Sequence, residues 1–308
     1  MRKIGRITVI TLLVLLTAFP AALAEGTFKP LPMDLSGGAP YDGDFASNMF
    51  VYEDPTIRVE RSREIQNPDL GTPYYAVDIQ VKDASQIRTA SADAKEFLTE
   101  RRIHAEVIAR RVNAVFAMNG DYSGDYHGNE STKHVLRQGI LFRDTVDTRL
   151  DMLMIDEDGD FHILPGGEEL ATADKTQING KKIVNVLQFG PGLVVDGKPV
   201  EEEYILSEDH SPQYAKPAGK AVRVCLLQMG PLHYKAICTK YAINMAAFQK
   251  LILTEAPDCV NAYVLDGGGS AQFVYLGRIV NHLNSKNNPN LRRVSDIVYF
   301  ASAWFQEE

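Results

Sequence analysis

One stretch of this 308-residue chain has the residue types best suited to catalysis or ligand binding: an acidic residue followed by three glycines and a serine. The apolar run 262–265 precedes this stretch and predicts a buried strand. The carboxylate at the strand end could exchange a proton, bind a metal or accept hydrogen bonds. The glycine amides can face an anion, because no Cβ atoms block them. The pattern therefore predicts a functional loop, with a plain hairpin turn as the alternative, and its members are Asp266, Gly267, Gly268, Gly269 and Ser270.

Polar residues also follow a second predicted buried strand, 114–118. Asn119 and Asp121 flank a glycine there, and Tyr122 and His127 follow in a polar loop. Functional loops usually lie at the strand ends of a rigid sheet, so Asp121 is a second candidate carboxylate. His127 is a candidate acid, base or ligand. The alternatives are a tight Asn-Gly turn and a solvent-exposed histidine.

Two arginines are candidates for binding an anion. Arg223 lies inside the mostly apolar run 221–229, where a guanidinium is costly unless a carboxylate or another anion pairs with it. Arg293 precedes the last predicted strand, 294–300. The alternatives are that Arg223 points to solvent and that Arg293 lies on an exposed rim of the sheet.

The first 24 residues have the pattern of a secretory signal peptide: a basic start, an apolar run over 7–19, and Ala22-Leu23-Ala24. We expect cleavage after Ala24 and a secreted or cell-envelope protein, with an uncleaved membrane anchor as the alternative. No later segment of the sequence is apolar and long enough to span a bilayer, so we expect no stable membrane insertion after cleavage.

The charge of the chain bears on its partners. The formal net charge is −8, and it becomes −11 when residues 1–24, with three basic and no acidic residues, are removed. An acidic exported protein without a basic, aromatic-rich run is a poor candidate for nucleic-acid binding.

The three cysteines are Cys225, Cys238 and Cys259. The predicted strands 222–229 and 233–239 place Cys225 opposite Cys238 if the turn centres between residues 231 and 232. Such a pair lies within reach of a disulfide, and export permits one. Two buried thiols are the alternative.

The order of predicted elements is typical of an α+β protein. We expect one domain over 49–308, with a large mixed, mostly antiparallel β-sheet core and flanking helices, after a leader or linker over 25–48. The expected helices are 94–112 and 241–254. The remaining expected strands are 49–52, 57–61, 74–81, 150–155 and 161–164.

Five motifs, in this order along the chain, resemble the phosphodiester glycosidase family. The resemblance covers roughly residues 75–302, and its motifs are 117–122, 189–197, Arg223, 264–270 and 293–296. It implies a hydrolase that cleaves a sugar-1-phosphodiester, releases the sugar and leaves a phosphomonoester on the acceptor. The substrate would then be a phosphorylated glycan or another sugar-1-phosphodiester.

The resemblance also implies roles for the candidate residues. Arg223 and Arg293 would hold the phosphodiester anion through fork-like hydrogen bonds. Asp266 and Asp121 would be the acid–base residues, with the assignment between them open, and Asn119 would orient substrate or water. The other expected substrate-binding residues are Gly267, Gly268, Gly269, Ser270, Tyr122 and His127.

Two other functions remain open from the residues. The first is a non-catalytic envelope module that binds anionic glycans. The second is a metal-dependent phosphodiesterase, in which Asp121 and Asp266 would be oxygen ligands of Ca²⁺ or Mg²⁺. No other cofactor is predicted.

Overall fold

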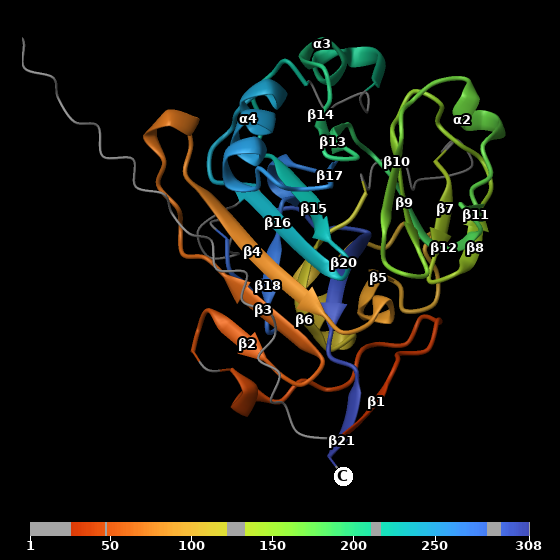
Figure 1. Cartoon of the computed structure of the whole chain (residues 1–308), viewed down its shortest axis with the longest axis vertical. Coiled ribbons are helices and arrows are strands. Elements are labelled where there is room, and N and C mark those ends of the chain that lie inside the picture. Colours follow the sequence, from red (N-terminus) through yellow and green to blue (C-terminus); the bar gives the residue numbers. More distant parts are fainter. Residues whose placement is uncertain (1–25, 47, 122–132, 211–216, 282–290, 308) are drawn as a thin grey trace, which may run out of the picture.

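A computed structural model of the chain describes residues 26–46, 48–121, 133–210, 217–281 and 291–307. Two β-sheets form its core and a third lies beside them (Figure 1). The α+β class and the mostly antiparallel core are confirmed. Every strand pairing among the described residues is antiparallel, so the sheets are not mixed, and the core is divided among several sheets.

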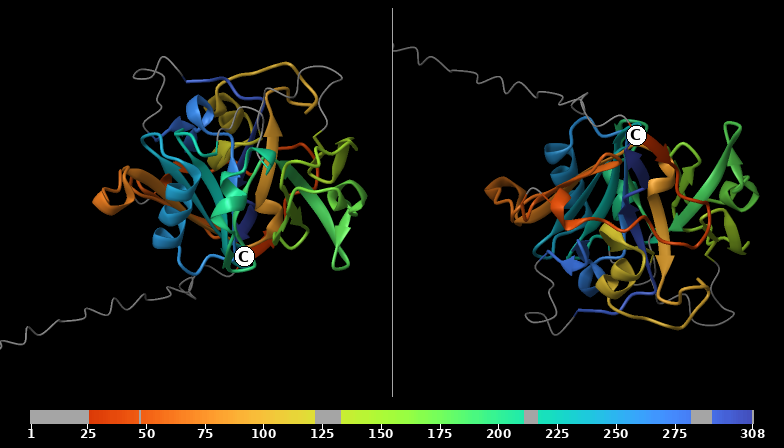
Figure 2. Two further views of the ribbon diagram at one scale, coloured as in Figure 1. Left: turned by 90° about the horizontal axis from the view of Figure 1, so that it is seen from above. Right: turned by 90° about the horizontal axis from the view of Figure 1, so that it is seen from below.

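The largest sheet has eight strands in the order β14-β13-β17-β15-β16-β4-β3-β2. Its strands are β2 (Val51–Glu53), β3 (Ile57–Arg61), β4 (Tyr74–Val81), β13 (Gly192–Val195), β14 (Lys198–Pro199), β15 (Val224–Gly230), β16 (His233–Thr239) and β17 (Asn261–Leu265). Helix α4 (Met245–Glu255) packs its buried residues into the same apolar cluster and covers the outer face of this sheet (Figure 2).

The second sheet has five strands in the order β19-β18-β6-β20-β5. Its strands are β5 (Ile87–Ser91), β6 (Ala114–Asn119), β18 (Phe273–Tyr275), β19 (Arg278–Ile279) and β20 (Asp296–Ala301). Alternate residues point to opposite faces of a strand. Phe116 and Phe300 therefore pack against the eight-stranded sheet, where the Phe300 ring lies 5.2 Å from that of Tyr234. Ala117 and Tyr299 pack against helix α1 (Ala105–Arg111) on the outer face.

The third sheet has four strands in the order β10-β9-β12-β11 and has an apolar cluster of its own. Its strands are β9 (Met152–Asp156), β10 (Phe161–Leu164), β11 (Gln177–Ile178) and β12 (Lys181–Gln188). The remaining elements are the hairpin of β7 (Val135–Arg137) and β8 (Ile140–Arg143), the pair of β1 (Gly26–Lys29) and β21 (Trp304–Glu307), and the short helices α2 (Glu169–Thr172) and α3 (Glu202–Leu206).

The first expected helix, 94–112, is wrong over its first half. Only Ala105–Arg111 is helical. Phe97, which the periodicity placed on the helix, instead packs with Val135 in a separate cluster, and Ile103 forms a β-bridge with Val294. Tertiary packing of these apolar residues overrides their helical spacing.

Residues 26–46, which the composition assigned to a leader or linker, pack on the domain. β1 pairs with β21, and the buried Arg88 guanidinium donates to the carbonyls of Pro32, Asp34 and Ser36. The expected signal peptide, 1–24, lies outside the described residues. Within them, no helix has the length and apolarity required to cross a membrane.

The expected pairing of Cys225 with Cys238 is wrong by one residue. The turn follows the predicted register, since Gly230 pairs with His233. A β-bulge next to Gly230 then shifts the pairing, so Cys225 lies opposite Ile237. All three cysteines are buried free thiols, and burial raises the pKa of both Cys225 and Cys238.

Candidate active site

The candidate residues gather where the five-stranded and eight-stranded sheets meet at their strand ends. Asn119 ends β6, Asp296 begins the neighbouring strand β20, and Asp266 follows β17 of the other sheet. The Asn119 side-chain amide donates a 2.7 Å hydrogen bond to the backbone carbonyl of Asp266. The two strand ends that the sequence marked as functional are therefore in direct contact.

A buried arginine joins two of the carboxylates. The Arg137 guanidinium, at the end of β7, lies 3.1 Å from Asp121 and 3.4 Å from Asp296 through the same nitrogen, Nη2. The Asp121 carboxylate also accepts a 3.0 Å hydrogen bond from the backbone N–H of Gln188. All three charged side chains are almost completely buried, so their interaction is screened little by solvent. Gly120 leaves room for this pair, because a Cβ there would lie 2.5 Å from the Asp296 carboxylate.

The environment of Asp266 raises the pKa of its carboxyl group towards neutral pH. Burial raises its pKa to about 6, although the Ser270 hydroxyl and the positive charges of Arg292 and Lys133 act in the opposite direction. The Lys133 side chain is only 2% exposed, and its ammonium lies 5.5 Å from the ring centre of Phe189.

The pKa of Asp296 is also raised. Burial and the negative charge of Asp121 raise its pKa, while Arg137 and Lys133 act in the opposite direction. Lys133 therefore acts on both Asp266 and Asp296. Perturbed carboxylates beside buried cations are typical of sites that move protons or bind anions.

The glycine loop approaches another part of the backbone closely. A Cβ at Gly267 would lie 2.2 Å from the carbonyl oxygen of Val222, and Gly268, at φ +59°, donates its N–H to the same oxygen at 2.8 Å. The Gly267 N–H faces the Asp266 carboxylate and lowers its pKa. The sequence predicted that these amides face a substrate anion, but the N–H groups of Gly267 and Gly268 have partners within the protein. Gly269 and Ser270 complete the short 3₁₀ turn.

The Arg223 guanidinium contacts backbone carbonyls. It donates to the backbone carbonyls of Ile243 at 3.1 Å and Gly219 at 2.8 Å. Burial lowers its pKa to about 10. These contacts stabilise the segment that follows residue 216.

Of the remaining candidates, the structure describes only Arg293. Arg293 is exposed, and its neighbour Arg292 is the residue whose charge acts on Asp266. Tyr122 and His127 lie outside the described residues. Among the described residues, no group of three or more His, Cys, Asp or Glu side chains is placed to hold a metal ion.

Four site residues were missed as candidates by sequence reasoning: Lys133, Arg137, Arg292 and Asp296. Asp296 was inside a motif that carried the family resemblance. Lys133 has no local pattern that distinguishes it from a solvated lysine.

Comparison with protein families identifies one family. A family model described as phosphodiester glycosidase matches residues 112–301. An uncharacterised SPbeta prophage-derived protein of Bacillus subtilis (strain 168), YomE, is 25% identical over 239 residues, which is 71% of this chain. The chain spans only 35% of the length of that relative.

Two solved structures have the same fold. The catalytic domain of zebrafish N-acetylglucosamine-1-phosphodiester alpha-N-acetylglucosaminidase, auto-inhibited by its pro-peptide, superposes with a TM-score of 0.62 at 17% identity, covering 81% of this chain and 85% of that one. A hypothetical protein from Synechocystis superposes with a TM-score of 0.54 at 12% identity, covering 82% and 64%.

Proposed function

The chain belongs to the phosphodiester glycosidase family, and from that membership we propose that it is an exported hydrolase of sugar-1-phosphodiesters. The enzyme cleaves the bond between the anomeric carbon and the phosphate oxygen, releases the sugar and leaves a phosphomonoester on the acceptor. The name of the zebrafish relative, which specifies an N-acetylglucosamine-1-phosphodiester, supports this class of substrate. The expected signal peptide supports export.

The observation that carries the proposal is the buried Asp266, whose pKa is raised to about 6 beside Lys133 and Arg292. A carboxyl group with such a pKa is substantially ionised at neutral pH and still basic enough to take a proton. In the reaction, the ionised Asp266 takes a proton from the attacking water. The water oxygen bonds to the anomeric carbon, and the bond to phosphate breaks with its electron pair on the phosphate oxygen.

The positive charges of Lys133 and Arg292 can stabilise the phosphate group of the substrate. A phosphodiester carries a negative charge, and the leaving phosphomonoester gains a second, so fixed positive charge stabilises the transition state more than the bound substrate. Lys133 and Arg292 both act on Asp266, and we assign phosphate binding to them. Because phosphate is a weak base, its departure needs little help from a general acid.

The Asp121–Arg137–Asp296 group, buried beside these residues, is assigned to positioning. Arg137 links the two carboxylates and fixes the start of β20 against the end of β6. Asn119 holds the Asp266 backbone, and the Ser270 hydroxyl lowers the pKa of the Asp266 carboxyl group.

The products distinguish this function from phosphodiesterase activity. Purified protein is incubated in ¹⁸O-labelled water with UDP-N-acetylglucosamine and with an alkyl diester of N-acetylglucosamine 1-phosphate. The proposal predicts free sugar that carries the label, together with unlabelled UDP from the first substrate and an unlabelled alkyl phosphate from the second. Sugar 1-phosphate, together with UMP or with the alkyl alcohol, would instead identify cleavage at phosphorus. No turnover across a panel of other sugar-1-phosphodiesters would contradict hydrolysis altogether.

A further inference from the structure

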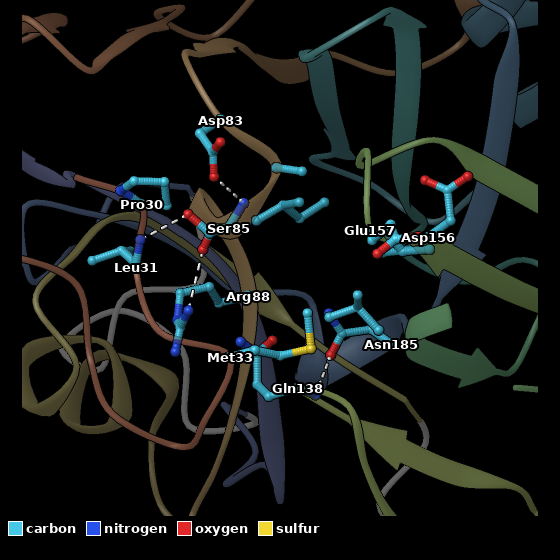
Figure 3. A pocket seen from close by; sticks show the side chains of 14 residues that line it. Pro30, Leu31, Met33, Asp83, Ser85, Arg88, Gln138, Asp156, Glu157 and Asn185 are labelled. Atoms are coloured by element: carbon cyan, nitrogen blue, oxygen red, sulfur yellow. Dashed lines mark hydrogen bonds between the residues drawn. The ribbon is translucent and has the colours of Figure 1, made fainter. Parts of the chain in front are cut away.

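A cavity lies between the third sheet, β5 and the N-terminal segment, and it shares no residue with the proposed active site (Figure 3). Its volume is about 250 Å³, slightly below the range of pockets that hold drug-sized ligands. Its labelled polar lining includes Ser85, Gln138, Glu157 and Asn185. A cavity of this size suits a ligand of one ring.

Asn185, a residue of the cavity wall, has a hydrogen-bond donor that no described residue uses. Its side chain is fully buried, and its Oδ1 accepts from the Thr89 hydroxyl at 2.8 Å and from the Gln138 backbone N–H at 3.0 Å. A backbone N–H can only donate, so this contact fixes which end of the amide is oxygen. The Nδ2 group then has no hydrogen-bond partner among the described residues. A buried donor without a partner is costly, which indicates that a ligand or a water molecule completes it.

The charges around the cavity disfavour an anion. Asp83, Asp156 and Glu157 all line it. The one guanidinium in its wall, that of Arg88, donates to backbone carbonyls of the segment 32–36 and to the Ser85 carbonyl. The Asp156 carboxylate is fully buried against His162 and Lys181, so a phosphorylated ligand would meet the carboxylates of Asp83 and Glu157. A metal cation would meet the Asn185 N–H group. A hydroxyl group can both accept from Asn185 and donate to a carboxylate.

The rest of the wall is aliphatic, with Met33, Ile87, Ile155 and Val184 among its members. Such side chains pack against the C–H face of a ring while hydroxyl groups at its edge reach polar partners. We propose that this cavity is a binding site for a neutral sugar ring, with Asn185 Nδ2 as its buried donor. The proposal concerns binding alone and stands apart from the hydrolytic function.

Methionine-methyl NMR of the full chain tests the proposal, because Met33 lies in the cavity wall. Protein with ¹³C-methyl methionine is titrated with N-acetylglucosamine, glucose and N-acetylglucosamine 6-phosphate, and the Met33 signal is assigned from a Met33→Leu variant. We expect a saturable shift of the Met33 methyl with a neutral sugar and none with the phosphorylated sugar. No saturable shift with either neutral sugar, or an equal response to the phosphorylated one, would overturn the proposal.

Two variants locate the bound sugar. Asn185→Asp keeps the oxygen that Thr89 and Gln138 use but removes the donor, and we expect about tenfold weaker binding. Ala84→Phe fills the cavity from a half-buried position and is expected to abolish the Met33 shift, which keeps the test valid if the first variant does not fold. Unchanged sugar affinity in the folded variants would overturn the assignment to this cavity.

Discussion

The side-chain amide of Asn119 spans two segments of the candidate site, donating to the Asp266 carbonyl at 2.7 Å and accepting from the Gln272 backbone N–H at 3.2 Å. It thereby holds both ends of the glycine loop against the end of β6. The amide also donates to the Gly120 carbonyl at 3.3 Å, so all its described contacts are to backbone atoms, and we assign Asn119 to positioning Asp266.

Replacing Asn119 with alanine is expected to lower kcat by roughly 10- to 100-fold, because a small displacement of a catalytic group is enough for such a loss. KM should change little. Steady-state kinetics on a sugar-1-phosphodiester, together with a thermal melt to verify folding, checks this split. A raised KM with an unchanged kcat would mean that Asn119 contacts the substrate instead.

Replacing Arg292 with glutamine is expected to move the acidic limb of the pH profile. The positive charge of Arg292 favours the ionised form of Asp266 and lowers its pKa, which is about 6. Removing that charge raises the pKa, so the rise of kcat/KM with pH moves to higher pH. Profiles are measured at low ionic strength, where an exposed charge is screened least.

Arg293→Gln is the matched control, since Arg293 is the adjacent exposed arginine. Its pH profile should coincide with that of the unaltered protein. Equal shifts in the two variants would show that the general charge of this edge acts on Asp266, and would contradict the specific assignment to Arg292.

Removing the buried guanidinium of Arg137 is expected to destabilise the fold strongly. Arg137→Met leaves the carboxylates of Asp121 and Asp296 buried without their shared cation, which typically costs about 3–5 kcal/mol. The control is Arg149→Met, because Arg149 pairs with Asp147 at 2.7 Å but is 58% exposed, and an exposed pair contributes about 0–1 kcal/mol. Urea unfolding measures both, and similar losses in the two variants would contradict this account of Arg137.

Arg223 offers a test between a structural and a substrate-binding role. Its guanidinium donates to the carbonyls of Ile243 and Gly219, so Arg223→Met should lower the melting temperature. KM for a sugar-1-phosphodiester should stay within about threefold of its normal value. A KM raised tenfold or more at unchanged stability would contradict the structural role and support the anion-binding role that the family resemblance implied.

Much of the strand structure could be predicted from the sequence, because alternation and turn residues are local signals. The strands 57–61, 74–81, 161–164 and 233–239 are found with the predicted bounds. The absence of a helix before Ala105 and the bulge next to Gly230 could not be predicted, since both depend on packing between segments far apart in the chain.

The candidate site was predictable in part for a similar reason. Asn119, Asp121 and Asp266 follow buried strands, and the structure brings them to one edge. Lys133 and Arg137 could not be assigned, because a buried cation is recognised only when its carboxylate partners are placed around it.

The central claim, that Asp266 carries the proton transfer, is tested most directly by Asp266→Asn. This change keeps the side-chain shape and removes the ionisable group, and Asp258→Asn, an exposed acid, is the control. Sugar release from a sugar-1-phosphodiester is measured with both variants after their folding has been verified. We predict that Asp266→Asn lowers the rate by about 10²- to 10⁴-fold while Asp258→Asn leaves it unchanged. A folded Asp266→Asn protein that releases sugar at the normal rate would contradict the claim.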